Sequence, residues 1–323
     1  MKKILFVLPL LFLLSCSQQP KVSIIFDTDI GPDYDDVGAM ALLHAFADKG
    51  EANILATISC NAFETTAPTL SVLNTYFNRP EIPIGIIKAE KPREACRQGW
   101  AQYINAKYPH KLNSNADAVE AVSLYRKILS EQPDNSVTVV TVGFFTNLAN
   151  LMDSPGDAYS PLTGMELVRK KVKMLVSMAA RMDAGTTSGR EFNVHVDALA
   201  SRKVFAEWPT PMLLSGFEIG ANILTGTQLI ANDEIQNSPV KDAFKIALEK
   251  DNNAIGRNSW DQSAVLVAVR GWEPFFGLRK VNFEIQDDGT NVLIPGEKFM
   301  YLTEKMPPAE TARIIEDLMM HQP

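Results

Sequence analysis

Short apolar runs alternate with segments of helical length along most of the chain. The apolar runs that have the length and composition of buried strands are residues 22–26, 54–59, 82–87, 137–142, 172–178 and 212–215. Between them lie segments such as residues 118–131, where apolar side chains recur at the spacing of an amphipathic helix. Strands that alternate with helices are typical of βαβ units. The pattern therefore predicts an α/β fold with an open, mostly parallel sheet flanked by helices.

Two late apolar runs, residues 281–285 and 291–294, flank the turn sequence Asp287-Asp288-Gly289. Short strands around such a turn predict a β-hairpin, which we place at the edge of the sheet. No linker rich in Pro, Gly or Ser interrupts residues 21–323, and the chain is 46% hydrophobic and 21% charged. This composition supports a sizeable core, so we expect residues 21–323 to form a single domain.

The first residues carry the pattern of an export signal. Lys2 and Lys3 precede an apolar stretch, residues 4–14, which ends at Leu13-Leu14-Ser15-Cys16. The stretch is too short to span a bilayer, which takes about 20 residues, and the cysteine at its end resembles a bacterial lipobox. We therefore expect residues 1–15 to be a signal peptide, Cys16 to be lipidated and residues 16–20 to be a tether. The protein would then be exported and anchored to a bacterial membrane, on its periplasmic side or at the cell surface.

Charge and cysteine content narrow the choice of partners. The net charge is −7 and the chain has no basic stripe, which argues against nucleic acid as a partner. Beyond Cys16, only Cys60 and Cys96 remain. In an oxidising compartment these two could form a disulfide, or they could be two free, buried thiols. The sequence also leaves open whether the chain forms a homo-oligomer.

Acidic side chains are concentrated in residues 27–36, which contain the five carboxylates Asp27, Asp29, Asp33, Asp35 and Asp36. They follow the first predicted strand and precede an apolar helical stretch, so they fall at the carboxyl edge of the sheet, where open α/β folds bind ligands. Carboxylates this close repel one another unless a cation neutralises them. Because the segment offers only oxygen ligands, it predicts a hard ion such as Ca²⁺ or Mg²⁺. The simpler alternative is a solvated acidic loop.

A second segment, residues 137–148, has the pattern of a strand, a glycine turn and a helix start. Gly143 would let the backbone turn closely and would expose the carbonyl of Val142 at the strand end, where it could bind a cation. Thr146 and Asn147 fit the ordinary role of capping the helix that follows.

A third segment places Glu191 and Asn193 two residues apart, so that they would share one face of an extended chain. A carboxylate and an amide in this arrangement can bind vicinal hydroxyls, one as acceptor and one as donor. His195 is two residues further along and would lie on the same face, although a structural role fits it better. Asp197 is expected to cap a helix at residues 198–207.

A fourth segment places Trp260 and Asp261 ahead of an apolar helix. Asp261 could cap that helix, or its carboxylate could be a further ligand of the cation. Trp260 could be a core residue or a stacking surface for a flat ligand.

These four segments, in this order, resemble the inosine-uridine-preferring nucleoside hydrolase family. The resemblance implies a tightly bound Ca²⁺ and cleavage of the N-glycosidic bond of ribonucleosides. By match to the family, the ligands of Ca²⁺ would be Asp29, Asp36, Asp261 and the carbonyl of Val142. Asp29 would also be the general base, and Asp27 would support the ligands from behind. The residues that hold the ribose hydroxyls would be Asp35, Asn61, Glu191 and Asn193.

The chain departs from the family pattern at three positions. Many members have His immediately before the last metal Asp, where this chain has Trp260. A purine-selective branch also carries Trp-Asp, with the indole stacked on the purine, so the resemblance implies that purine nucleosides are favoured. Gly185 stands where the family usually has Asn. Asp33 is an addition to the acidic motif, and the resemblance assigns it no role.

Two other functions fit parts of the sequence. A lipid-anchored protein could bind Ca²⁺ and a nucleoside or sugar without cleaving it, since a fold does not fix a function. A phosphohydrolase of the HAD type also begins with a strand followed by Asp-x-Asp, here Asp27-Thr28-Asp29. That second alternative would leave Glu191, Asn193 and Asp261 unused.

Overall fold

A computed structural model describes residues 21–90, 92–183 and 185–323. The expected signal peptide at residues 1–15, the lipidation of Cys16 and the tether at residues 16–20 lie outside the described residues. Within the ranges that are described, the helices are all too short or too polar to cross a membrane.

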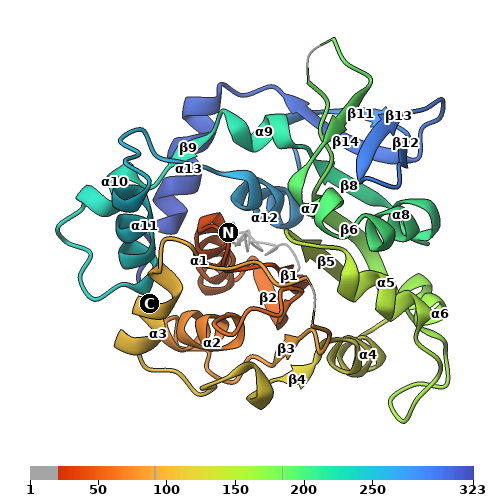
Figure 1. The fold of residues 1–323 in the computed structure, drawn as a ribbon, viewed down its shortest axis with the longest axis horizontal. Helices are drawn as coiled ribbons and strands as arrows, with labels where there is room; N and C mark the ends of the chain where they lie inside the picture. Colours follow the sequence, from red (N-terminus) through yellow and green to blue (C-terminus); the bar gives the residue numbers. More distant parts are fainter. Residues whose placement is uncertain (1–20, 91, 184) are drawn as a thin grey trace, which may run out of the picture.

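A nine-stranded sheet runs through the molecule (Figure 1), in the order β11-β14-β8-β6-β5-β1-β2-β3-β4. Its strands are β1 (Val22–Thr28), β2 (Ala52–Ser59), β3 (Ile84–Ile86), β4 (Val119–Glu120), β5 (Val137–Thr141), β6 (Val172–Met178), β8 (Met212–Ser215), β11 (Phe276–Val281) and β14 (Phe299–Glu304). Neighbouring strands are parallel, except that β11 and β14 at one edge are antiparallel. The predicted open, mostly parallel sheet is therefore confirmed.

The order of the strands reverses at the middle of the sheet. From β1 the chain continues outward through β2 and β3 on one side, whereas β5, β6 and β8 lie on the other side. In open α/β sheets, the crevice at such a reversal, outside the carboxyl ends of the strands, is where ligands bind. The segment that follows β1 carries Asp29, Asp33, Asp35 and Asp36, and the segment that follows β5 carries Val142. The topology therefore brings these residues to the crevice.

Helices cover both faces of the sheet (Figure 1). The hydrophobic core on one face includes side chains of α1 (Asp35–Asp48), α2 (Thr66–Tyr76), α3 (Trp100–Lys107), α10 (Thr227–Ala231), α11 (Pro239–Lys250), α12 (Trp260–Arg270) and α13 (Pro308–Met319). The other face packs against α4 (Ala121–Glu131), α5 (Thr146–Asp153), α6 (Gly164–Lys171) and α8 (Ala198–Glu207). Ile24 and Phe26 of β1 belong to the first core and Ile25 belongs to the second. A strand buried on both faces is apolar throughout, which explains the continuous apolar runs in the sequence.

The predicted elements agree with the structure except near their ends. The predicted strands at 172–178 and 212–215 coincide with β6 and β8, and the other four differ by one or two residues at an end. The helix predicted at 118–131 begins only at Ala121, because the Glu120 side chain caps it by accepting hydrogen bonds from the backbone N–H groups of Val122 and Ser123.

The late hairpin forms, but its predicted place at the edge of the sheet is wrong. Strands β12 (Phe283–Ile285) and β13 (Thr290–Leu293) pair with each other, and β13 also pairs with β7 (Ser188–Arg190) in a separate three-stranded sheet. Val281 belongs to β11 instead. The small sheet bears on the site, because β7 leads directly to Glu191.

Candidate active site

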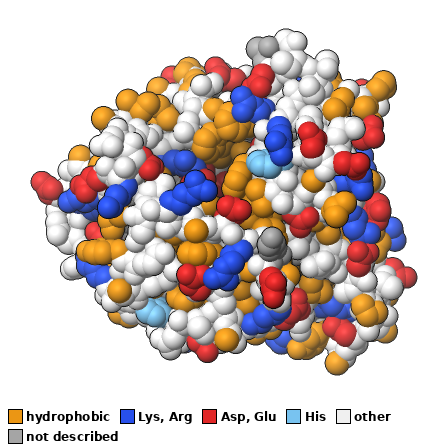
Figure 2. All heavy atoms as spheres, viewed as in Figure 1, with side chains coloured by type: hydrophobic (Ala, Val, Ile, Leu, Met, Phe, Trp, Pro, Cys, Tyr) orange, Lys and Arg blue, Asp and Glu red, His pale blue; other side chains and the backbone are white. Residues whose placement is uncertain are grey.

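A pocket whose water-accessible volume is about 120 Å³ lies where β1, β5 and β6 end. The residues that line it are Asp29, Asp33, Asp35, Glu191, Asn193 and Asp261, together with Val142, Met178, Phe192, Phe217 and Trp260. Figure 2 shows apolar side chains beside acidic ones near the middle of this face of the molecule. The mixture of polar and apolar lining suits a small molecule that has both a polar and a flat apolar part.

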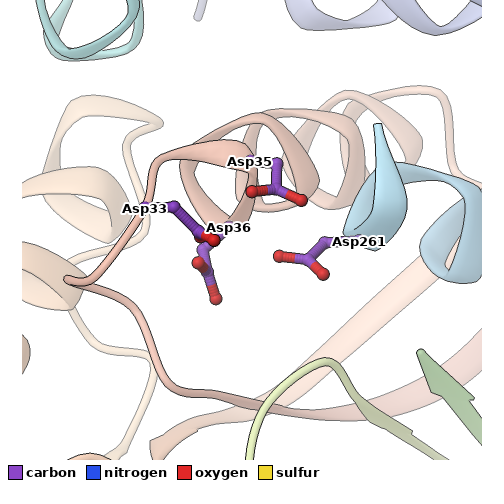
Figure 3. Close-up of side chains that lie close together, drawn as sticks. All are labelled: Asp33, Asp35, Asp36 and Asp261. Carbon is purple, nitrogen blue, oxygen red and sulfur yellow. The ribbon is translucent and has the colours of Figure 1, made fainter. Parts of the chain in front are cut away.

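Four carboxylates converge here (Figure 3), and three of them, Asp33, Asp35 and Asp261, line the pocket. Asp33, Asp35, Asp36 and Asp261 each place an oxygen atom within 4.8 Å of the others. The first three lie in or just before the first turn of α1, and the fourth lies in the first turn of α12. The two helices can pack closely because Gly38 of α1 has no side chain, since a Cβ there would lie 2.4 Å from Nε2 of Gln262 in α12.

Three carboxylates at the site, those of Asp29, Asp36 and Asp261, have no positively charged partner among the described residues. Burial raises the pKa values of Asp29, Asp36 and Asp261 well above their usual range, and the neighbouring carboxylates raise them further. One oxygen of Asp36 accepts a hydrogen bond from the Thr28 hydroxyl, but the other, Oδ2, is buried and has no partner among the described residues. An unpaired buried carboxylate oxygen is costly, and an oxygen-only donor set suits a hard divalent cation. The residues therefore fit a metal ion.

The segment after β5 brings Val142 to the pocket. The turn that follows requires glycine, because a Cβ on Gly143 would lie 2.4 Å from the backbone nitrogen of Asp29 and 2.7 Å from Sγ of Cys60. The predicted tight turn is confirmed, and its cause is the close approach of two strand ends. Cys60 and Cys96 are both buried and unpaired, so of the two alternatives the structure has free thiols.

Asp27 is fully buried and does not line the pocket. The Tyr125 hydroxyl donates a hydrogen bond to it at 2.8 Å, and the Asn147 amide lies 3.2 Å from both of its oxygens. Burial raises the pKa of Asp27 to about 7, although these hydrogen bonds oppose the shift. The prediction that Asn147 caps a helix is wrong, because Phe145 holds the cap position of α5 and no side chain caps it. Asn147 instead anchors Asp27, a contact that the sequence did not reveal.

Glu191 and Asn193 both reach the pocket, but the prediction of an extended segment is wrong. Glu191 caps the short helix α7 (Phe192–Val196) by accepting hydrogen bonds from two of its backbone N–H groups at 2.9 and 3.1 Å. The Asn193 amide donates to the carbonyls of Val142 at 3.0 Å and Met178 at 3.2 Å. Burial raises the pKa of Glu191 to about 7. Each carboxylate oxygen has two acceptor sites, so Glu191 can still accept a hydrogen bond from a hydroxyl.

His195 and Asp197 do not line the pocket. Nδ1 of His195 lies 3.0 Å from the backbone oxygen of Glu191, and its ring packs edge-on against Phe192. This agrees with the structural role that we preferred for it. Asp197 caps α8 as predicted, since its carboxylate accepts a hydrogen bond from the backbone nitrogen of Ala200 at 3.2 Å.

Asn61 is buried, but it is not among the residues that line the pocket. Its Nδ2 donates to the carbonyls of Asp29 at 3.0 Å and Glu94 at 2.9 Å. Its Oδ1 accepts from the backbone nitrogens of Phe63 at 3.1 Å and Glu94 at 2.9 Å. These bonds use the full hydrogen-bonding capacity of the amide. Asn61 therefore ties the Asp29 backbone to a neighbouring loop and has no group left for the predicted ribose contact.

Trp260 is half-buried at the start of α12 and lines the pocket. A Cβ on Gly220 would lie 2.4 Å from the Cα of Trp260, so the absence of that side chain lets α9 (Phe217–Ala221) approach α12. The indole thus packs against the protein on one side and faces the pocket on another. Asp261 does not cap α12, because Ser259 holds that position.

Arg257 contacts the acidic cluster, and sequence reasoning missed it. Its Nη2 lies 2.5 Å from Asp33 and 2.6 Å from Asp35, and its Nε lies 3.0 Å from Asp35. Burial raises the pKa of Asp35 to about 7, although the guanidinium opposes the shift. A signal was present in the sequence, since Arg257 stands three residues before Trp260 and so belongs to a segment already assigned to the site.

Gly185 lies outside the pocket-lining residues. It is exposed, its φ is +79°, and a Cβ built on it would meet no atom within 4 Å. The position at which the family usually has Asn therefore gives the pocket no hydrogen-bonding group in this chain.

The fold and the pocket together define an α/β protein whose small-molecule site is built around clustered, buried carboxylates. The chain belongs to the inosine-uridine preferring nucleoside hydrolase family, whose model matches residues 24–318. It is therefore an N-ribohydrolase, a glycosidase of the family whose members are metal-dependent and act on ribonucleosides. This confirms the resemblance that the four sequence segments carried. A comparison with curated proteins gives no match.

Solved structures share the fold at low sequence identity. The effector protein XOO4466 is 12% identical with a TM-score of 0.70, and the match covers 94% of each chain. The inosine-uridine preferring nucleoside hydrolase of Bacillus anthracis is 14% identical with a TM-score of 0.70, covering 93% of this chain and 99% of that one. The purine-preferring ribonucleoside hydrolase of Gardnerella vaginalis is 14% identical with a TM-score of 0.68, covering 92% and 99%.

Proposed function

We propose that this protein is a Ca²⁺-dependent nucleoside hydrolase that cleaves ribonucleosides to ribose and free base and prefers purine nucleosides. The observation that carries the proposal is a cluster of four carboxylates. Three of them line one pocket beside aromatic side chains, and the fourth, Asp36, has a buried oxygen without a partner among the described residues. Negative charge suits the sugar, which becomes cationic as the bond breaks, and the aromatic side chains suit the base.

Asp29, Asp36 and Asp261 would hold the cation through their carboxylates, and Val142 would hold it through its carbonyl. Ca²⁺ in such a site would orient and acidify the attacking water and hold the ribose diol. The high pKa values of the buried acids support this assignment, because a bound cation restores their ionised form.

Asp29 would act as the general base. It lines the pocket at the end of β1, and it would take a proton from water as the water oxygen bonds to the anomeric carbon. The N-glycosidic bond breaks in the same process, and its electron pair goes to the nitrogen of the base. The sugar resembles an oxocarbenium ion at this point, so fixed negative charge around it lowers the barrier.

Asp35, Glu191 and Asn193 would bind the ribose hydroxyls. All three line the pocket and would act as acceptors, Asn193 through its Oδ1, because its Nδ2 already donates to the carbonyls of Val142 and Met178. Asn61 is left out of this set because its amide is fully used elsewhere.

Trp260, with Phe217 beside it, would contact the departing base. No histidine stands before Asp261 to protonate that base, so stacking on the indole would favour its departure. A purine has a larger ring surface than a pyrimidine, which supports a preference for purine nucleosides.

The reaction would take place outside the cytoplasm. The basic start, the apolar stretch and Cys16 of the sequence support export and a lipid anchor in a bacterial membrane. Labelling of cells with a radioactive fatty acid would test this, because Cys16→Ser should abolish incorporation into the protein.

Release of ribose from a panel of nucleosides tests the activity. The purified protein is incubated with inosine, guanosine, adenosine and uridine, and then again after chelation and after addition of Ca²⁺ or Mg²⁺. We expect ribose from the purine nucleosides, loss of activity on chelation, and recovery with Ca²⁺. Nucleoside binding by calorimetry without ribose release would instead favour the alternative of a binding protein.

A further inference from the structure

Arg257 is held rigidly next to the pocket without lining it. It lies in β10 (Arg257–Asn258), which pairs with β9 (Leu224–Thr225). The Asn258 amide donates to the carbonyl of Ala221 at 2.6 Å, and the backbone nitrogen of Ser259 donates to the carbonyl of Ile223 at 2.8 Å. These bonds fix the strand, so the guanidinium is presented at a defined place.

The guanidinium contacts two parts of the pocket wall at once. On one side it donates hydrogen bonds to Asp35 and forms an ion pair with Asp33. Its central carbon also lies 4.9 Å from the ring centre of Trp260 and 5.2 Å from that of Tyr34, within range for cation–π contact. Arg257 thus joins the carboxylate assigned to the ribose with the indole assigned to the base.

The carboxylates of the cluster differ in what neutralises them. Asp33 and Asp35 have the arginine as partner, whereas Asp36 keeps a buried oxygen without a partner among the described residues. All four acids of the cluster are nevertheless close enough to hold one ion. Something must therefore determine which of them coordinate the cation and which remain for the substrate.

We propose that Arg257 is a positioning residue that withholds Asp33 and Asp35 from the cation and holds Asp35 in place for the ribose. The inference rests on the proposed function. It also gives Asp33 a role, since a second carboxylate on the same guanidinium fixes its orientation. A planar guanidinium can bridge two carboxylates and lie against an indole at the same time, which a lysine ammonium cannot do.

Calcium binding to the full-length protein tests the inference directly. After chelator treatment, Ca²⁺ is titrated by calorimetry into the wild type, Arg257→Met and Arg257→Lys. Removal of the guanidinium frees two carboxylates to join the ion, and Ca²⁺ affinity in proteins rises with the charge of the ligands, so we expect Arg257→Met to bind Ca²⁺ about fivefold or more tightly. Arg257→Lys keeps the charge but not the bridge, so its affinity should fall between the two.

Sugar selectivity provides the second measurement. If Arg257 holds Asp35 for a hydroxyl, the ratio of kcat/KM for inosine to that for 2′-deoxyinosine should fall about tenfold in Arg257→Met, because a carboxylate that is no longer held in place loses its hydrogen bond to the 2′-hydroxyl. If Arg257 only stabilises the fold, Arg257→Met should lower kcat/KM for both nucleosides by the same factor and leave the ratio unchanged.

Arg270→Met is the matched control. Arg270 is also paired with a carboxylate, Glu51 at 2.8 Å, and lies 4.8 Å from the ring centre of Phe46, but it does not contact the acidic cluster. It should keep the Ca²⁺ affinity and the ribose selectivity of the wild type.

Ca²⁺ affinity in Arg257→Met that is equal to or weaker than in Arg270→Met would overturn the inference. If Arg257→Met does not fold, as judged by circular dichroism, Arg257→Lys decides by the same comparison. A wild type that binds Ca²⁺ but releases no ribose would contradict the proposed hydrolysis alone, and the calcium titrations would still decide the role of Arg257.

Discussion

The indole nitrogen of Trp260 donates a hydrogen bond of 2.7 Å to the backbone carbonyl of Phe217. The two rings lie 5.0 Å apart and are tilted by 31° to each other, and both line the pocket. The hydrogen bond fixes the plane of the indole, so the pocket presents a flat apolar surface of defined orientation.

Loss of this surface should affect purine nucleosides more than pyrimidine nucleosides. Trp260→Ala is expected to lower kcat/KM for inosine about tenfold, since aromatic stacking contributes about 0.5–1.5 kcal/mol beyond the burial of surface. The loss for uridine should be smaller. Steady-state kinetics with both substrates measure this, and Trp260→Phe should retain part of the preference. An equal loss for both substrates would mean that the indole only packs.

Asp29→Asn should remove most of the activity while the fold persists. Removal of a general base costs about 10²–10⁴ in rate, and loss of a metal ligand adds to that cost. Single-turnover rates with inosine measure the first effect, and circular dichroism with a thermal melt controls for folding. Wild-type turnover in this variant would rule out Asp29 as the base.

Nucleosides without a 2′-hydroxyl should be poor substrates. Asp35, Glu191 and Asn193 line the pocket, and leaving a buried polar group without its partner costs roughly 1–3 kcal/mol. We therefore expect kcat/KM for 2′-deoxyinosine to be at least about tenfold below that for inosine. Equal turnover of the two nucleosides would show that these side chains do not bind the 2′-hydroxyl of the ribose.

The stability of the metal-free protein should fall as the pH rises from about 4.5 to about 7. Burial raises the pKa of Glu191 from 4.5 to about 7, so in this interval the folded chain keeps a proton that the unfolded chain has released. The contribution of Glu191 is therefore fully present below the lower value and is lost as the pH approaches the upper one.

Glu191→Gln isolates this contribution, because the amide does not titrate. In the presence of chelator, Tm from scanning calorimetry should fall more steeply with pH for the wild type than for Glu191→Gln. The difference in unfolding free energy across the interval is up to about 3 kcal/mol, at about 1.4 kcal/mol per pKa unit. Parallel curves for the two proteins would show that Glu191 titrates normally.

The sequence by itself determined the sheet and the place of the acidic cluster. Buried parallel strands are continuous apolar runs, so the first and last residues of β6 and β8 could be predicted correctly from local composition alone. The carboxyl ends of parallel strands meet at one edge of the sheet, so residues that follow such strands, such as Asp29 and Val142, could be assigned to one pocket before their distance was known.

Local pattern was a poorer guide where a side chain could serve two purposes. Asn147 follows a glycine turn at a helix start, which is typical of a cap, yet it hydrogen-bonds to Asp27. Glu191 and Asn193 have the spacing of an extended pair, but the backbone turns into α7 between them. In each case the competing partner comes from tertiary contacts, which the periodicity of the sequence does not encode.

Only the tertiary structure decided which polar groups remain for a ligand. Asn61 has the residue type and the position of a substrate contact, but its amide is fully used by backbone groups of Asp29, Phe63 and Glu94. Arg257, which lies in the short ladder between β9 and β10, contacts Asp35 across 222 positions of the sequence. Hydrogen-bonding capacity and charge are shared among all neighbours in space, so their allocation follows from the packed fold and not from the order of the residues.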